Sequence, residues 1–331
     1  MRNDRILIAI FFLVIFVVLP QIASAHLSGR KEVGSFIHTM VSKHGFNLQR
    51  LNELFQQLES SEEVLKQISK PFETVSWGRY RRLFLTKERI KEGVNFWQAY
   101  QKTLEHAEYQ FGVPIEIIIS VIGIETFYGK YVGQYSVLQS LATLAFDYPK
   151  RSKFFLNELE QYLLLTREQQ LPVELMKGSY AGAMGASQFI SSSYRNYAID
   201  FEMKGKVDLT NSIPNAIGSV ANYLNAHGWK TQQSIVHKAT KEGEKYKSLL
   251  IQNVKPTVTI SALAQYGVHC MANTLQDSNT LVVFLELDNA GIKEYWLGRD
   301  NFYVITRYNN SVNYAMAVYE LSQAISKMLN R

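Results

Sequence analysis

Hydrophobic residues recur at helical spacing through most of the first 245 residues of the chain. Apolar positions three and four apart predict helices over residues 35–43 and 48–58, with Asn47 as the N-cap of the second. The same pattern predicts one long amphipathic helix over 96–111. Residues 76–82 are aromatic and basic, and we expect them to form a loop or a short turn between these helices.

The pattern stays helical in the middle of the chain and changes near residue 246. Residues 138–170 and 212–227 are predicted to be helical, with a proline at a helix start in each. After residue 246, alternating β-branched residues and an apolar run predict strands, of which 280–287 is the strongest. Residues 302–306 are also expected to be β-like, and 314–329 closes the chain as a helix. The fold class is therefore mainly α (α+β), a helical body with a small β-rich insert.

One predicted helix, within residues 112–129, is strongly apolar and carries a carboxylate at its far end. Ile117, Val121 and Glu125 fall at i, i+4 and i+8, so Glu125 lies on the buried stripe, close to where Gly129 can end the helix. Desolvation and the negative end of the helix dipole both predict a raised pKa for Glu125. A carboxylic acid that is protonated near neutral pH can protonate the leaving oxygen of a glycosidic bond. For a lone Glu, a side chain that reaches solvent at a helix end is the simpler interpretation.

The N-terminal residues have the pattern of a secretory signal peptide. Two arginines precede a 14-residue apolar run, 6–19, and an Ala-Ser-Ala cleavage pattern follows at 23–25. We expect residues 1–25 to be removed, leaving a soluble periplasmic protein that starts at His26. No Cys lies near this site, so a lipid-modified N-terminus is not expected.

Cysteine content and charge fit an exported protein without disulfides. Cys270 is the only cysteine, which excludes an intramolecular disulfide, and we expect it to be a buried structural thiol. The formal charge of +6 becomes +5 without the signal peptide, an excess that suits a polyanionic partner or simply aids solubility. Nucleic acid is not expected as a partner, because no binding motif is present. Serine-hydrolase, zinc-peptidase, phosphate-loop and dinucleotide-binding motifs are also absent.

Small, aromatic and amide-bearing residues form further candidate sites. In the small-residue run 178–189, Ser179 and Gln188 are placed to contact sugar hydroxyls or N-acetyl groups, although tight helix packing explains the run equally well. Tyr80, Tyr223 and the segment 307–314 add aromatic rings and amides, which bind sugars by stacking and hydrogen bonding. Taken singly, each of these is more often a packing residue.

Taken together, these segments resemble the lytic transglycosylase B family of bacterial peptidoglycan-cleaving enzymes. The resemblance is carried, in the family's order and over nearly the whole mature chain, by residues 77–82, 112–129, 141–151, 177–189, 216–229 and 301–317. It implies a lysozyme-like helical core, an additional helical region and a small β domain. The implied units are a signal peptide (1–25), an N-terminal helical region (26–110), the catalytic core (111–245), a small β-rich domain (246–299) and a C-terminal segment that returns to the core (300–331).

The resemblance also implies the site and the reaction. It makes Glu125 the single catalytic acid/base, and it places around the glycan Tyr80, Ser179, Gln188, Phe189, Tyr223, Tyr308, Asn309 and Tyr314. The family cleaves the β-1,4 bond between N-acetylmuramic acid and N-acetylglucosamine and leaves a 1,6-anhydro ring. The implied partner is the peptidoglycan glycan strand; proteins of cell-wall synthesis or division are conceivable partners that the sequence does not identify.

One loop departs from the family pattern. The best-known member of the family has an EF-hand-like calcium loop, and four of its positions are matched here by Asp200, Glu202, Gly205 and Asp208. Position 5, however, is Lys204, and position 12 is Asn211 in place of a bidentate carboxylate. We therefore expect no cofactor and weak or absent calcium binding. Two alternatives to a lytic transglycosylase stay open: a hydrolytic muramidase, which needs a second carboxylate, and a non-catalytic peptidoglycan-binding protein.

Overall fold

The computed structural model describes residues 26–70, 75–250, 254–271 and 277–330. The predicted signal peptide, 1–25, lies outside the described residues. The helices are α1 (Lys31–His44), α2 (Leu48–Gln56), α3 (Glu62–Ile68), α4 (Trp77–Phe84), α5 (Lys87–Ala99), α6 (Gln101–Phe111), α7 (Ile115–Thr126), α8 (Val137–Asp147), α9 (Ser152–Glu168), α10 (Ser191–Tyr197), α11 (Ile213–Ala226), α12 (Ile260–Leu263), α13 (Asp300–Tyr308) and α14 (Val312–Leu329). Short 3-10 turns occupy Pro149–Arg151, Lys245–Leu249 and Ala264–Tyr266.

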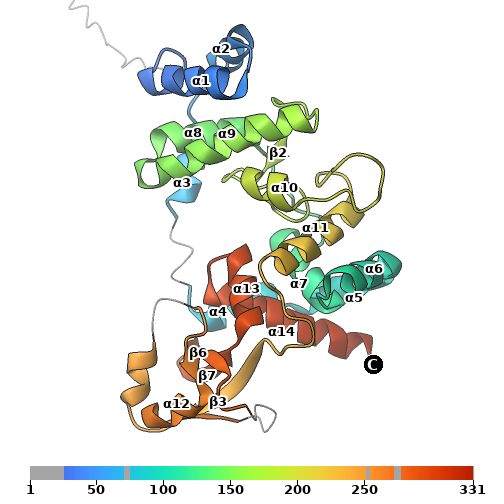
Figure 1. Cartoon of the computed structure of the whole chain (residues 1–331), viewed down its shortest axis with the longest axis vertical. Coiled ribbons are helices and arrows are strands. Elements are labelled where there is room, and N and C mark those ends of the chain that lie inside the picture. Colours follow the sequence, from blue (N-terminus) through green and yellow to red (C-terminus); the bar gives the residue numbers. More distant parts are fainter. Residues whose placement is uncertain (1–25, 71–74, 251–253, 272–276, 331) are drawn as a thin grey trace, which may run out of the picture.

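A small antiparallel sheet lies at one end of the helical body (Figure 1). Its strands are β3 (Val236–Lys241), β4 (Val258–Thr259), β5 (Val268–Cys270), β6 (Leu281–Asn289) and β7 (Ile292–Gly298), in the order β4-β6-β7-β3-β5. The hairpin of β6 and β7 is in register from Val283 opposite Gly298 to Asn289 opposite Ile292. A second, two-stranded pairing joins β1 (Tyr135–Ser136) to β2 (Lys177–Gly178).

The helices form two groups that share one hydrophobic core. α1, α2, α3, α8 and α9 lie together at the end away from the sheet, whereas α4, α5, α6, α7, α11, α13 and α14 gather in the middle of the molecule (Figure 1). The predicted N-terminal region, 26–110, is thus divided between the two groups. The sheet also begins earlier than predicted, because β3 precedes residue 246. A separate small apolar cluster packs within the sheet domain and includes Val268, Phe284 and Leu297.

α7 is the centre of the second group. Ten of its twelve residues are buried, and it packs against α5, α6, α11 and α14. Such an apolar helix is stable only when it is enclosed on every side, because each buried Ile or Val contributes about 1.5–3 kcal/mol relative to exposure. α7 ends at Thr126, before the predicted Gly129, because Phe127 and Tyr128 both adopt left-handed backbone conformations. The enclosure of α7 fixes the position of Glu125 in its last turn.

The prediction of a loop or short turn over residues 76–82 is wrong, because this segment lies in helix α4. Trp77 and Tyr80 lie three apart and are both buried, while Arg79, Arg81 and Arg82 are exposed on the other face. The segment is therefore an amphipathic helix whose apolar face is aromatic. Its high charge and its lack of a side-chain N-cap hid the helical spacing.

Three further predictions differ from the structure. The single helix predicted over 96–111 is two helices, because the backbone leaves helical geometry at Tyr100, which ends α5. The β-like segment 302–306 is instead the middle of α13, where β-branched side chains are buried against the helical core and packing overrides their strand propensity. Cys270 is only partly buried, in β5.

Candidate active site

The side chain of Glu125 is placed by the way α7 ends. The neighbouring Thr126 hydroxyl donates to the Ala186 carbonyl at 2.9 Å and accepts from the Gly129 amide at 2.9 Å. These bonds tie the end of α7 to the small-residue run that contains Ala186. Glu125 itself is mostly buried but is not sealed from solvent, in contrast to nearly every other residue of α7. It is therefore positioned to meet a ligand while it is surrounded by protein.

Burial raises the pKa of Glu125 to about 7. The Tyr314 hydroxyl acts in the opposite direction and lowers the pKa of Glu125, although it forms no hydrogen bond of good geometry with any described residue. The Tyr314 hydroxyl lies near the carboxyl, and its effect on the pKa of Glu125 is smaller than that of burial. Desolvation dominates, so the pKa of Glu125 lies near neutral pH, where its protonated form is well populated.

Three tyrosines from three helices surround the Glu125 carboxyl. Tyr80 comes from α4, Tyr308 from the end of α13 and Tyr314 from the first turn of α14, and these helices converge with α7 (Figure 1). The pKa of each phenol is raised first by burial and then by the charge of Glu125. The rings of Tyr308 and Tyr314 are nearly parallel, with centroids 6.4 Å apart. The sequence-predicted acid and three of its predicted neighbours therefore share one site.

An aromatic cavity of about 130 Å³ adjoins this site through Tyr308. Predicted residues in its lining are Gln188, Phe189, Tyr223 and Tyr308, and Ile190, Ser193 and Arg307 complete it. The Tyr223 ring lies 4.9 Å from that of Tyr308 and 5.5 Å from that of Phe189, measured between centroids. The Tyr223 and Tyr308 hydroxyls donate to the carbonyls of Arg307 and Ser187, which fixes the orientation of both rings. Ring surfaces held in this way suit the stacking of a sugar.

Ser179 and Gln188 use part of their polar capacity on the loop that holds them. The Ser179 hydroxyl accepts from the amides of Ala181 and Ala183, and it can still donate its own hydrogen. The Gln188 amide group donates to the carbonyls of Val132 and Gly185 at 3.0 Å, and its side-chain carbonyl can still accept.

The small residues of this loop are also needed for packing. A Cβ on Gly185, whose φ is +69°, would lie 2.0 Å from the Leu209 carbonyl oxygen. The two interpretations of residues 178–189 therefore both apply. Asn309, the last predicted glycan contact, is exposed immediately after Tyr308 at the end of α13.

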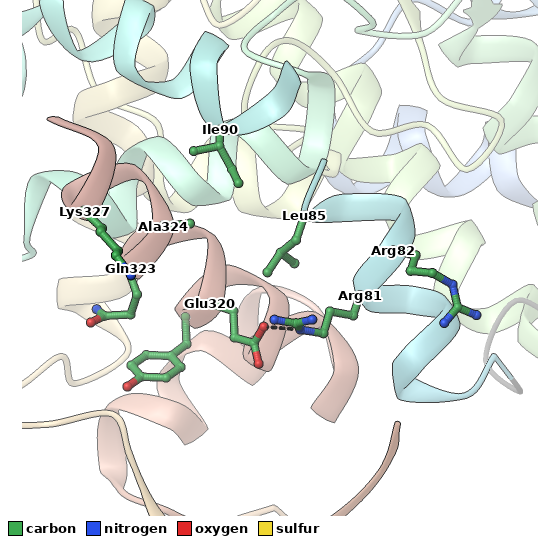
Figure 2. Close-up of a pocket in the computed structure, with 9 residues that line it drawn as sticks. Arg81, Arg82, Leu85, Ile90, Glu320, Gln323, Ala324 and Lys327 are labelled. Carbon is green, nitrogen blue, oxygen red and sulfur yellow. Dashed lines mark hydrogen bonds and ion pairs between the residues drawn. The ribbon is translucent and has the colours of Figure 1, made fainter. Parts of the chain in front are cut away.

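A wider groove, of about 440 Å³, lies between α4 and α14 and is separate from this site (Figure 2). Leu85, Ile90 and Ala324 contribute apolar surface, and Arg81 of α4 pairs with Glu320 of α14. Glu125 and its tyrosines do not line it. The groove's described contacts serve to hold α4 against α14, and with it Tyr80 against Tyr314.

The loop over residues 200–211 satisfies its own carboxylates. Lys204 donates to one oxygen of Glu202 at 2.8 Å, and the Ser212 hydroxyl donates to the other at 2.6 Å. The Asp200 carboxylate accepts from the Lys204 and Gly205 amides. Asp208 accepts from the Thr210 amide and from both the amide and the side chain of Asn211. An ammonium group thus stands at the fifth position of the loop, where an EF-hand-like loop has an oxygen ligand.

Sequence reasoning missed Arg89, whose guanidinium contacts the ends of both α4 and α7. Nothing local could have revealed it, because an arginine in the first turn of an amphipathic helix usually faces solvent. Arg307 also lines the aromatic cavity, and its position beside Tyr308 is the only signal in the sequence that points to it.

Comparison with known proteins gives consistent matches over most of the chain. The family described as Transglycosylase SLT domain matches residues 28–323. The chain is 40% identical over 304 residues to the membrane-bound lytic murein transglycosylase B of Escherichia coli (strain K12), covering 88% of this chain and 81% of that protein. The soluble lytic transglycosylase SltB1 from Pseudomonas aeruginosa is similar in structure, with a TM-score of 0.85, 41% identity, and coverage of 91% of this chain and 100% of that one.

Two similar structures carry bound groups. The Escherichia coli lytic transglycosylase Slt35 in complex with calcium matches with a TM-score of 0.84 and 38% identity, over 95% of this chain and 100% of that one. SltB3 from Pseudomonas aeruginosa, in complex with NAG-anhNAM-pentapeptide, matches with a TM-score of 0.77 and 27% identity, over 89% of this chain and 78% of that one.

The raised pKa of Glu125 predicts a pH-dependent cost in stability. The folded-state pKa of about 7 lies above the ordinary value of 4.5, so the carboxyl destabilises the fold progressively as pH rises from about 4.5 to 7. Glu125→Gln cannot ionise and should be more stable than the natural protein above pH 7, by up to about 3 kcal/mol. The two should be nearly equal below pH 4. Denaturant titrations across this range measure the difference, and a difference independent of pH would contradict the raised pKa.

Proposed function

Because the chain belongs to the Transglycosylase SLT domain family and is a lytic murein transglycosylase that cleaves peptidoglycan, we propose that Glu125 is its single catalytic carboxyl group and that the product is a 1,6-anhydromuramic acid end. The observation that carries this proposal is the burial of Glu125 among three tyrosines, which raises the pKa of its carboxyl to about 7. Among the described residues, Glu125 is the carboxylate whose charge acts on both Tyr308 and Tyr314.

The first step is proton donation. Glu125, protonated at its raised pKa, gives its proton to the glycosidic oxygen as the bond from that oxygen to C1 of N-acetylmuramic acid breaks. The N-acetyl group of the same sugar assists at C1, held by groups such as Ser179 and Asn309. The Tyr314 hydroxyl favours the ionised form of Glu125, so it stabilises the carboxylate left after donation.

The second step returns the proton. The Glu125 carboxylate accepts the proton of the C6 hydroxyl of the muramic sugar as that oxygen forms its bond to C1. The ring closes without water, and Glu125 is protonated again for the next cycle. One carboxyl group therefore serves as acid and then as base, which needs no second carboxylate to activate water.

The aromatic cavity supports binding of a glycan strand beside Glu125. The partly exposed Tyr308 ring is backed by the buried rings of Phe189 and Tyr223, and Gln188 and Ser179 offer an acceptor and a donor within the same loop. The SltB3 complex with NAG-anhNAM-pentapeptide is consistent with such a ligand in the family. A hydrolytic muramidase is the second candidate, but it needs a second carboxylate near Glu125.

We also propose that the protein acts in the periplasm, freed from its signal peptide and without a lipid anchor. The support is the sequence pattern of residues 1–25. The relative in Escherichia coli differs in this respect, because it is named as membrane-bound. Within the described residues, no single helix is long and apolar enough to cross a membrane, and only the sharply bent pair α6 and α7 passes on length and composition.

Substitution of the catalytic acid gives the central functional prediction. Glu125→Gln keeps the shape of the side chain but removes the acid, so turnover of purified peptidoglycan should fall by about 10²–10⁴-fold while glycan binding persists. Turnover by the natural enzyme should also decline as pH rises through about 7, where Glu125 loses its proton.

Mass spectrometry of the digest identifies the reaction. Muropeptides one water lighter than hydrolytic products are expected from the natural enzyme. Reducing muramic acid as the main product would instead establish a muramidase and overturn the single-carboxyl mechanism.

The loop over residues 200–211 predicts activity without calcium. Lys204 places a positive charge where a cation would bind, so chelation should leave both turnover and the melting temperature unchanged. Lys204→Asp supplies the missing oxygen ligand and should make the melting temperature rise with added calcium. A rise in the natural protein at micromolar calcium would refute this expectation. Lys206→Asp is the matched control, because it changes charge equally at position 7 of the loop, where the ligand is the backbone carbonyl and not the side chain.

The location is checked by intact-mass measurement of the exported protein from a cell fractionation. The expected species starts at His26 and is found in the periplasmic fraction. A species that keeps residues 1–25 in the membrane fraction would show that the segment is an anchor.

A further inference from the structure

The Arg89 side chain lies between the two helices that carry Tyr80 and Glu125. Arg89 is in the first turn of α5, where the Thr86 side chain caps its backbone amide at 3.1 Å. Its Nη1 donates to the carbonyl oxygens of Leu83 at 2.8 Å and Phe84 at 3.2 Å, and its Nε donates to that of Gly123 at 3.1 Å. One guanidinium group thus bonds three backbone carbonyls.

These carbonyls belong to two helix ends. Leu83 and Phe84 are the last residues of α4, and Gly123 lies in the last turn of α7, two residues before Glu125. Carbonyls at helix C-termini carry the negative end of the helix dipole, and the last ones lack intrahelical partners. The Gly123 carbonyl accepts from the Phe127 amide at 3.1 Å as well as from Arg89. A cation that bonds both ends neutralises two dipoles and keeps the helices at a fixed separation.

Aromatic packing holds the guanidinium in this place. Its central carbon lies 5.0 Å from the ring centroid of Phe84 and 5.1 Å from that of Phe127. Phe127 is the left-handed residue that ends α7, so the arginine also supports the turn that follows Glu125.

The backbone of Arg89 is fixed as well, because the buried Tyr128 hydroxyl donates to its carbonyl at 2.7 Å. Tyr128 in turn packs against Gly123, where a Cβ would lie 2.7 Å from its ring. The side chain of Arg89 is therefore bonded to Gly123 of α7, and its backbone is bonded to Tyr128 in the turn that follows α7.

The charge of Arg89 also reaches the catalytic surround. It lowers the pKa of Tyr80, whereas burial and the charge of Glu125 raise it. Tyr80 lies one helical turn before Phe84, and Glu125 lies in the same turn as Gly123. A shift of either helix end would thus move one of the two side chains relative to the other.

We propose that Arg89 is a positioning residue of this enzyme, which clamps the C-terminal ends of α4 and α7 and so sets the place of Tyr80 relative to Glu125. This inference rests on the proposed role of Glu125. The fork of a guanidinium is required, because the three carbonyls are reached from two different nitrogens. A lysine would keep the charge at the helix ends but would lose the fixed geometry.

The test compares Arg89→Met and Arg89→Lys with Arg167→Met as the matched control. Arg167 makes the same kind of contacts elsewhere: its Nη1 donates to the His44 carbonyl at 2.7 Å, and it stacks on Phe46 at 4.1 Å. For each variant, the melting temperature is determined first. The kcat and KM on purified peptidoglycan are then measured at one assay temperature, well below the lowest of these melting temperatures.

Arg89→Met should lower kcat by about ten- to a hundredfold with little change in KM, because binding surfaces are kept while the acid and Tyr80 lose their alignment. Arg89→Lys should recover part of the loss. Arg167→Met should lose melting temperature but keep kcat. Unchanged kcat in folded Arg89→Met or Arg89→Lys, or an equal loss in Arg167→Met, would overturn the proposal.

The products of the natural enzyme and of Arg89→Lys separate this result from a failure of the proposed function. If both yield hydrolytic muramic ends, the single-carboxyl mechanism is wrong, yet the loss of kcat on removing Arg89 still tests the clamp. If both yield anhydro ends and kcat does not change, the mechanism stands and the clamp is refuted.

Discussion

Burial of one carboxyl group at the end of an apolar helix is the constraint on which the structure depends. α7 is enclosed on all sides, and Glu125 occupies its last turn, where desolvation outweighs the single opposing effect of Tyr314. A protein accepts an unfavourable group of this kind only when the surrounding structure is stable enough to hold it. The helices that enclose α7 supply that stability, and they also bring the tyrosines to the carboxyl.

The tyrosines of the site fall into two sets, those influenced by the charge of Glu125 and one that lies behind them. Tyr80, Tyr308 and Tyr314 are under the influence of its charge, and they come from helices far apart in the chain. Tyr223, held by a bond to the Arg307 carbonyl, packs behind Tyr308 and extends the aromatic surface into the adjoining cavity. The proposed sites of proton transfer and of sugar binding are thus adjacent, and they share Tyr308.

Residues within one helix could be predicted from the sequence, and contacts between helices could not. The spacing of Ile117, Val121 and Glu125 predicted a carboxyl on a buried face. Asn47 was predicted to be an N-cap, and its side chain accepts from the Arg50 amide. α4 was missed because its apolar face is made of aromatic residues among arginines. The grouping of the tyrosines was predicted from the family resemblance and not from residue spacing, because Tyr80 and Tyr314 are brought together by the packing of α4 on α14. Arg89 was missed because its partners belong to two other helices.

The most direct measurement is the ionisation of Glu125 itself, followed by NMR of selectively ¹³C-labelled glutamate, with Glu125→Gln used to assign the resonance. The account predicts that this carboxyl titrates at a pKa of about 7. A titration near the ordinary value of 4.5 would mean that Glu125 is ionised at neutral pH, and it would contradict the role of a protonated acid on which the mechanism rests.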